Sequence, residues 1–475
     1  MLRIHNSLTG EKEEFRPLRP NEVRMYVCGM TVYDHIHVGH ARMLTVFDLV
    51  QRYLRSRGYT VTYVRNVTDI DDKIIQRAAD NGEDWRELAR RFTASMHEDC
   101  AALGLQSPDL EPRATDFIAP IITMTQTLID KGYAYVAATG DVLYAVRKFA
   151  GYGRLSGKRI DELWAGSRVQ IEESKLDPLD FVLWKQAKPG EPFWASPWGN
   201  GRPGWHIECS AMSTSLLGNY FDLHGGGMDL KFPHHENEIA QSCAACDTPF
   251  VQVWMHNGFV RIDDEKMSKS LGNFFTVREV LKSLRHPEVL RFFLLSSHYR
   301  GPINYSDAQL SQADETLLGL YRALNDVGSG APADTGDARV DAGDTTQGEP
   351  RGRFNAAMDD DFNTPDALAV MQGVARDLNS AKAAGKHRDA TALAASLRDM
   401  GQVLGLLQQA PEVYLKRGIG TESLSDGDIA GLLDSRRTAR AAKNFAESDR
   451  IRDLLGAAGV MLEDKAGGTT TWRRS

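Results

Sequence analysis

Apolar positions near the N-terminus change from a strand-like to a helix-like pattern. Residues 23–28 form a short apolar run typical of a buried strand, and residues 41–54 carry apolar side chains at helical spacing. Gly58 marks a turn, after which a β-branched run covers residues 60–67. A strand, a helix and a second strand predict a βαβ unit, and therefore a parallel sheet covered by helices.

Later segments repeat this pattern or depart from it. Residues 220–224 indicate another strand, which we expect to break at the glycines 225–227 before a helix that starts near Pro233. In between, residues 120–200 are rich in Tyr, Trp, Gly and Pro and lose the helical period. This composition predicts a subdomain inserted into one α/β domain.

The C-terminal part has a third pattern. Residues 327–352 hold almost no large apolar side chain, which predicts a linker. Residues 367–407 are rich in Ala, Leu and Met at helical spacing and predict a helical bundle. We find no internal repeat that would indicate a solenoid.

Composition then excludes several classes of protein. The 475 residues, 42% hydrophobic and 25% charged, are typical of a soluble globular protein with several domains, and no apolar run is long enough to cross a bilayer. The first residues show neither a secretory signal nor a transit peptide, so we expect a cytoplasmic protein. Five scattered cysteines argue against a disulfide framework, and a net charge of −8 argues against a surface coated in positive charge.

Two histidines lie where the first predicted strand passes into its helix. His37 and His40 share one helical face, and Gly39 between them lets a ligand approach the backbone. The positive end of the helix dipole lies at the same point and favours a phosphate group. By themselves, these histidines are equally consistent with capping or packing.

A polar loop lies more than 200 residues further along the chain. Lys266-Met-Ser-Lys-Ser270 offers two lysines and two hydroxyls, which can surround the negative charge of a reacting triphosphate. A solvated surface is the simpler interpretation of such a loop by itself. The two histidines belong to the motif His37-Val-Gly-His40 (HxGH), and the loop is the motif KMSKS. An early HxGH motif followed much later by KMSKS favours nucleotide binding for both.

This pair of motifs resembles the signature of class I aminoacyl-tRNA synthetases, and its surroundings resemble the cysteinyl-tRNA synthetase family. The resemblance covers the whole catalytic half and, more loosely, the C-terminal part. Val38 departs from the commoner isoleucine, which is a conservative change. The matching stretches are Tyr26–Arg42, Asn66–Lys73, Gly204–Ser210, Asp222–Asp229, Phe232–Glu238, the KMSKS loop, Met358–Pro365 and the closing Thr-Trp-Arg.

The resemblance implies a Rossmann-like catalytic domain with an inserted subdomain, then an α-helical bundle and a small anticodon-binding domain. The expected division is catalytic domain 1–119 and 201–260, insertion 120–200, KMSKS loop and stem-contact region 261–326, linker 327–352, bundle 353–412 and anticodon-binding domain 413–475.

Four residues far apart in sequence suggest a metal site. Cys28 ends the first strand, Cys209 follows Trp-His-Ile-Glu, and His234 and Glu238 are spaced to share one helical face. A Cys₂-His-Glu set suits zinc, although His234 could merely cap its helix. In the resembled family all four positions are zinc ligands. From the residues alone, two other ligands remain open: His224 and His235.

Zinc would suit a thiol substrate. A free thiol has a pKa near 8.5 and loses its proton on binding zinc, whereas a serine hydroxyl is far less acidic. An ordinary pocket separates close analogues by only about 10- to 200-fold. The hypothesis is that zinc binds the substrate thiolate directly and removes the need for an editing site.

The other cysteines have a plainer interpretation. Cys243 and Cys246 form a CxxC pattern, but no second CxxC or histidine pair completes a zinc site. If the helix after Pro233 continues, both thiols lie on it as small apolar side chains. Cys100 is expected to be structural as well.

Further roles come from the resemblance. His37, His40, Lys266 and Lys269 would be catalytic and would bind the phosphates of ATP, which enters with Mg²⁺. The remaining expected ATP-binding residues are Gly39, Gly226, Asp229 and Ser268. The cysteine pocket would include Gly29, Thr68 and Trp205, although Trp205 is equally consistent with packing.

The implied reaction is activation of L-cysteine by ATP to cysteinyl-adenylate, followed by transfer to the terminal adenosine of tRNA(Cys), by a monomer. Residues 435–475 hold nine Lys and Arg against five acids. This surplus of positive charge fits either binding of a tRNA anticodon, with Trp472 available for stacking, or an ordinary solvated helix.

Two rival functions are a mycothiol-pathway ligase that joins cysteine to an amino sugar and a non-catalytic zinc-containing nucleic-acid-binding protein. The linker, bundle and basic end argue against the first, and the intact HxGH and KMSKS motifs argue against the second.

Overall fold

The computed structural model divides the chain into two compact units. The first unit comprises residues 1–274, 297–304 and 356–364, and the second comprises 275–296, 305–355 and 365–475. Among the helices in the described part of the chain, none combines the length and the hydropathy needed to span a membrane. The structure describes residues 1–160, 175–262, 265–266, 274–327, 350–418, 424–464 and 470–474.

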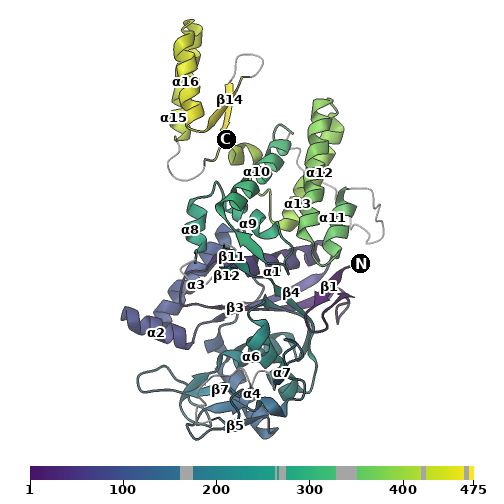
Figure 1. Ribbon diagram of the computed structural model, residues 1–475, viewed down its shortest axis with the longest axis vertical. Coiled ribbons are helices and arrows are strands. Elements are labelled where there is room, and N and C mark those ends of the chain that lie inside the picture. The colour runs from purple at the N-terminus through teal and green to yellow at the C-terminus, as the bar shows by residue number, and fades with distance from the viewer. Residues whose placement is uncertain are drawn as a thin grey trace. The chain divides into compact units, whose positions relative to one another are not determined.

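A four-stranded parallel sheet lies at the centre of the first unit (Figure 1). Its order is β10-β9-β3-β4, with α1 (Val38–Ser56) leading from β3 to β4 and α7 (Glu236–Cys246) leading from β9 to β10. Most side chains of these strands are buried, as expected where helices cover both faces. The predicted α/β class is confirmed. The strands are β3 (Glu22–Thr31), β4 (Thr60–Thr68), β9 (Tyr220–Gly227) and β10 (Phe250–Asn257).

The three glycines at 225–227 extend β9, so the expected strand break is wrong. A Cβ on Gly225 would overlap the ring of Phe47 in α1. A Cβ on Gly226 would lie 2.8 Å from Cε1 of His235. Glycine is therefore needed here because neighbouring side chains approach the strand backbone closely, not because the chain turns.

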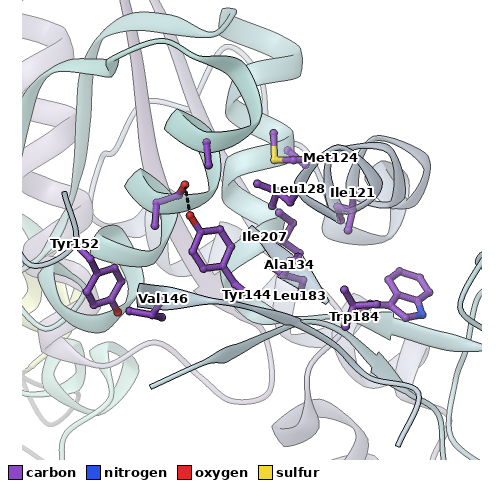
Figure 2. Close-up of a cluster of buried hydrophobic side chains, with 14 residues drawn as sticks. Ile121, Met124, Leu128, Ala134, Tyr144, Val146, Tyr152, Leu183, Trp184 and Ile207 are labelled. Carbon is purple, nitrogen blue, oxygen red and sulfur yellow. Dashed lines mark hydrogen bonds between the residues drawn. The ribbon is translucent and has the colours of Figure 1, made fainter. Parts of the chain in front are cut away.

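An antiparallel sheet and helices α4 and α6 form a second core within the first unit (Figure 2). In Figure 2, Ile121 and Leu128 of α4 lie over the sheet, near Ile207 of α6. The hydroxyl of Tyr144 donates a hydrogen bond to the carbonyl of Ala240 in α7 at 2.8 Å and ties this core to the central domain. The elements are α4 (Ile118–Asp130), β5 (Ala134–Val136), β6 (Val142–Tyr144), β7 (Phe181–Gln186), β8 (Gly201–Pro203) and α6 (Trp205–Leu217).

Late segments of the sequence complete the first unit. Asp361 is fully buried and accepts hydrogen bonds from the Tyr299 hydroxyl at 2.8 Å, the Arg300 Nε at 2.7 Å and the backbone N of His5 at 2.9 Å. The carbonyl of Tyr299 in turn accepts from the backbone N of Gly258 at 2.8 Å. The unit's other elements are β1 (Arg3–Asn6), β2 (Glu11–Glu14), α2 (Asp72–Asn81), α3 (Trp85–Ala102), β11 (Val260–Ile262), β12 (Glu265–Lys266) and the start of β13 (Ile303–Tyr305).

The described part of the second unit is mainly helical, as predicted for the C-terminal half. Tyr321 and Tyr414 stack with ring centroids 3.9 Å apart, and the Tyr321 hydroxyl donates to Glu288 at 2.7 Å. The expected linker, 327–352, lies mostly outside the described residues. The helices are α8 (Val277–Lys282), α9 (Pro287–Leu295), α10 (Asp307–Leu324), α11 (Pro350–Asp359), which ends in the first unit, α12 (Thr364–Ala383), α13 (His387–Leu404) and α14 (Pro411–Leu415).

The last helices and strands form a small core of their own. Ile429, Ile451 and Leu455 are buried in it, and Trp472 packs against them while two cationic side chains approach its ring. Arg436 is largely buried, so not every cation of this segment faces solvent. The elements are α15 (Asp426–Ala441), α16 (Phe445–Ala457), β14 (Val460–Asp464) and β15 (Thr470–Arg474).

Candidate functional site

The end of β3 bends around a glycine. The pairing of β3 with β4 shifts register between Val27 and Met30, and the backbone N of Gly29 donates to the Asn66 side chain at 2.7 Å. A Cβ on Gly29 would overlap the carbonyl oxygen of Asn66. Only glycine fits at this bulge, which holds Cys28 immediately before it.

Sulfur, imidazole and carboxylate groups meet beside this bulge. The Cys28 Sγ lies 3.6 Å from the Cys209 Sγ, 3.4 Å from the His234 Nε2 and 3.3 Å from the Glu238 Oε1. His234 and Glu238 approach to 3.0 Å, as their spacing predicts. All four side chains are almost completely buried. The structure therefore brings together the four residues of the expected metal site.

His235 belongs to the same neighbourhood. Single donor atoms of Cys28, His234, His235 and Glu238 lie within 4.8 Å of one another and could hold a metal ion. The His235 Nδ1 lies 2.8 Å from the Nε2 of His256. His235 Nε2 lies 4.0 Å from the Glu238 Oε1. The alternative ligand His235 thus remains compatible with the geometry.

Charges within the cluster oppose the cost of burial. Burial raises the pKa of Glu238, but His224 and His234 more than reverse this and hold it well below its usual range. Burial lowers the pKa of His234, yet Glu238 and Cys209 raise it to about 10. Burial also raises the pKa of Cys209, while hydrogen bonds from Cys28 and His234 bring it down to about 6. A buried carboxylate and a thiolate are suited to a bound cation, which would displace protons on binding.

Two further histidines hold the cluster in place. The His224 Nε2 contacts the Glu238 Oε2 at 2.9 Å, and the His206 Nδ1 contacts the His234 Nδ1 at 2.9 Å. Burial lowers the pKa of His206 to about 3, so this ring is neutral at pH 7. Because His224 uses its Nε2 on Glu238, it acts here as a positioning group for that carboxylate. The resemblance supplied both residues as parts of longer motifs, and His224 was also named as an alternative ligand, but no spacing rule predicted the contacts of either.

The HxGH histidines cap helix α1. His37 is the N-cap, and its Nδ1 accepts a hydrogen bond from the backbone N of His40 at 3.2 Å. The two rings stack with centroids 3.6 Å apart. Their capping role is compatible with ligand binding, since both rings also line a pocket at the helix N-terminus.

This pocket has a volume of about 480 Å³ and contains much of the expected site. Its lining includes Gly29, His37, Gly39, His40, Trp205 and Asp229. The indole of Trp205 stacks on the ring of His234 at a centroid distance of 4.3 Å and is 39% exposed, so it separates the buried cluster from the pocket. Lys73 also lines the pocket and was not predicted, although it closes one of the resembling stretches.

Other expected site residues lie differently. Gly226 is packed against His235, and its neighbour Gly227 lines the pocket instead. The Thr68 hydroxyl donates to Glu208 at 3.0 Å, and Thr68 is not among the described residues that line the pocket. Lys266 lies in β12, where it pairs with Arg261 of β11. Ser268 and Lys269 lie outside the described residues.

The CxxC pair is on α7, as predicted. Cys243 and Cys246 are partly buried, and burial raises the pKa of Cys243 to about 11. Neither belongs to the cluster of possible metal ligands among the described residues. Cys100 is buried in α3.

Comparison with known proteins agrees with this geometry. A family model described as tRNA synthetases class I (C) catalytic domain matches residues 14–315, a DALR domain matches 353–408, and a cysteinyl-tRNA ligase anticodon binding domain matches 425–473. The chain is 62% identical to a cysteine–tRNA ligase of Methylococcus capsulatus over 474 residues and 60% identical to one of Thioalkalivibrio sulfidiphilus over 480 residues. Both alignments cover 100% of each chain.

Solved structures share the fold. Methionyl-tRNA synthetase of Mycobacterium tuberculosis, in complex with methionyl-adenylate, superposes with a TM-score of 0.57 at 17% identity, over 83% of this chain and 91% of that one. The leucyl enzyme of Agrobacterium radiobacter, in a ternary complex, gives a TM-score of 0.55 at 12% identity, over 84% and 86% of the two chains. At such low identity the likeness shows a class I synthetase fold.

Proposed function

This chain belongs to the cysteine–tRNA ligase family of class I aminoacyl-tRNA synthetases, and we propose that it selects cysteine through a zinc ion held by its buried cluster. One observation carries the proposal. The sulfur, imidazole and carboxylate cluster lies directly behind Trp205 and Gly29, both of which line the pocket that contains the HxGH histidines. A site for the substrate thiol would thus adjoin the pocket that would hold the phosphates.

The donor set suits zinc. Cys28, Cys209, His234 and Glu238 would hold the ion with two sulfurs, one nitrogen and one oxygen, and His206 and His224 would orient the imidazole and the carboxylate. Bound there, zinc would supply a Lewis acid that favours a thiolate over a hydroxyl.

The activation step needs no nucleophile from the protein. The substrate carboxylate attacks the α-phosphate of ATP, the bond to the β-phosphate breaks, and pyrophosphate leaves with Mg²⁺. His37, His40 and the N-terminus of α1 would stabilise the charge on the phosphates. Lys266 and Lys269 would act on the same charge, and Gly39 would allow its close approach.

The rest of the pocket suits the nucleoside and the amino acid. Asp229 and Gly227 line the pocket, and Asp229 would accept hydrogen bonds from the ribose hydroxyls, while Gly226 packs against His235. Trp205 would cover the substrate side chain, while Thr68 would support the pocket through Glu208. Ser268 completes the proposed set on the KMSKS loop.

The second step transfers cysteine to the 3′-terminal adenosine of tRNA(Cys). The matched anticodon binding domain at residues 425–473 supports tRNA as the partner. We further propose that the enzyme works as a monomer in the cytoplasm. Light scattering would give its mass in solution.

The proposed function is tested by two assays on the intact protein. Cysteine-dependent exchange of pyrophosphate into ATP should be strong, serine should give no exchange, and total tRNA should be charged with cysteine. Exchange without charging would indicate transfer to another acceptor, such as an amino sugar. Absence of exchange would contradict the proposal.

A further inference from the structure

A second cavity lies in the first unit, outside the pocket proposed for the activation step. Its volume is about 300 Å³, and its lining includes Arg86, Arg90, Arg113, Trp85, Trp194 and Asp69. None of the described residues that line the catalytic pocket lines this cavity. The cavity thus combines three guanidinium groups and two indoles that the proposed ATP and cysteine sites do not include.

The cavity lies at the same edge of the sheet as the catalytic pocket. Asp69 directly follows β4, and Val67 at the end of that strand forms a parallel bridge with Arg113. Lys73, only four residues after Asp69, lines the catalytic pocket. A ligand long enough to follow residues 69–73 could therefore occupy both cavities.

The arginines of this cavity are exposed and can exchange their present ion-pair partners for a ligand. The side chains of Arg86 and Arg90 are 68% and 69% exposed, and their partners are the neighbouring surface acids Asp84, at 3.6 Å, and Glu87, at 2.8 Å. Exposed ion pairs of this kind contribute little to stability, so a phosphate can replace a carboxylate at low cost. Arg113 is exposed as well.

The carboxylate of Asp69 in this cavity already accepts hydrogen bonds from within the protein. Asp69 is largely buried and accepts hydrogen bonds from the backbone N of Thr115 at 3.0 Å and from its hydroxyl at 2.6 Å. Its oxygens are therefore turned toward Thr115, and the cation surplus of the lining is available to an anion.

The aromatic groups offer planar surfaces. Trp85 and Trp194 meet edge to face with centroids 6.2 Å apart, and the Arg86 guanidinium lies 4.5 Å from the centroid of the Trp85 ring. Trp194 comes from the inserted subdomain, and Trp85 begins α3. Indole rings and guanidinium planes beside cationic side chains are what unpaired nucleotides stack on.

We propose that this cavity binds an unpaired, phosphorylated nucleoside from the acceptor end of the tRNA. The base stacks on the indoles and the phosphate contacts Arg90 and Arg113. This inference rests on the proposed function, because that function requires an RNA strand to reach the catalytic pocket. A free nucleotide has the same chemistry, so the experiment must separate the two sources.

The test reverses two exposed charges in the full-length protein. The double variant Arg90→Glu/Arg113→Glu should raise the KM for tRNA in charging by about tenfold or more, because each lost phosphate contact becomes a repulsion. Trp194→Ala should raise it by about fivefold or more through lost stacking. Cysteine-dependent pyrophosphate exchange should stay within about twofold of wild type. The matched control is Arg16→Glu/Arg77→Glu, which reverses two exposed arginines outside both cavities.

Filter binding of tRNA keeps the test independent of activity. If the wild type shows no exchange, the proposed function fails, but a loss of tRNA binding in the cavity variants alone still supports the cavity as an RNA site. An unchanged tRNA affinity in both cavity variants would overturn the inference. Binding of AMP that only the cavity variants abolish, with tRNA affinity unchanged, would assign the cavity to a free nucleotide and overturn it as well.

Discussion

Two pairs of cysteines in this chain show opposite relations between sequence and chemistry. Cys28 and Cys209 are 181 residues apart, yet their sulfurs lie 3.6 Å from each other beside an imidazole and a carboxylate. Cys243 and Cys246 are neighbours on α7 and belong to no such cluster among the described residues. Topology, not proximity in sequence, brings the first pair together, because β3 and α6 pack against each other.

Cys209 and Cys243 also differ in pKa because their surroundings differ. Hydrogen bonds from Cys28 and His234 outweigh burial and lower the pKa of Cys209 to about 6, whereas burial raises the pKa of Cys243 to about 11. At pH 7 the first is therefore ready to bind a cation and the second is a neutral, small side chain. For Cys243, burial outweighs the opposing charge of Arg154, which favours a structural interpretation of this thiol.

The largest expected effect comes from the buried pair. Cys209→Ser should reduce bound zinc to near zero and lower cysteine-dependent pyrophosphate exchange by more than about 100-fold, beyond what loss of an orienting group causes. Metal analysis and exchange kinetics measure the two quantities. Full exchange by a zinc-free variant would contradict the role of zinc, and an unaltered circular dichroism spectrum is the control for folding.

An intermediate effect is expected for a residue that contacts a proposed zinc ligand without being one itself. His224→Ala removes the contact to the Glu238 Oε2 without removing a proposed ligand, so zinc affinity should fall by about 10- to 100-fold. Competition with a chelator measures the affinity. If affinity fell as far as in Cys209→Ser, His224 would itself be a ligand, and the alternative reading of the site would be correct.

The smallest effect is expected for the CxxC pair. Cys243→Ala and Cys246→Ala should leave bound zinc and exchange within about twofold of wild type. Loss of zinc in either variant would show that the two pairs are not distinct.

Cys243 is also expected to make the free energy of unfolding depend on pH. The pKa of Cys243 is raised to about 11 in the folded protein from an ordinary value near 9, so its contribution is fully present below pH 9 and is lost as pH rises to 11. This difference between the two pKa values corresponds to at most about 2.7 kcal/mol of unfolding free energy. Chemical denaturation should therefore give a constant difference in unfolding free energy between wild type and Cys243→Ala below pH 9, and the wild type should lose more than the variant as pH rises from 9 to 11. A difference that stays constant up to pH 11 would contradict the burial effect.

Local rules and resemblance account for part of this site. Helical spacing predicted that His234 and Glu238 face one point, but joining them to Cys28 and Cys209 needed the family resemblance. The contacts of His206 and His224 depend on how α6 and β9 pack, which no spacing in the sequence expresses. Gly225 was misread because a glycine required by a close neighbour looks, in sequence, like a glycine required by a turn.

The burial of Asp361 bears on how this enzyme can be dissected. Its carboxylate joins the Tyr299 hydroxyl, the Arg300 guanidinium and the backbone of His5, although it lies beyond residue 315, where the match to the catalytic family model ends. A fragment cut at that limit would leave three donors without their acceptor and open the interior of the first unit. A catalytic fragment is therefore expected to need residues 356–364, which belong to the first unit.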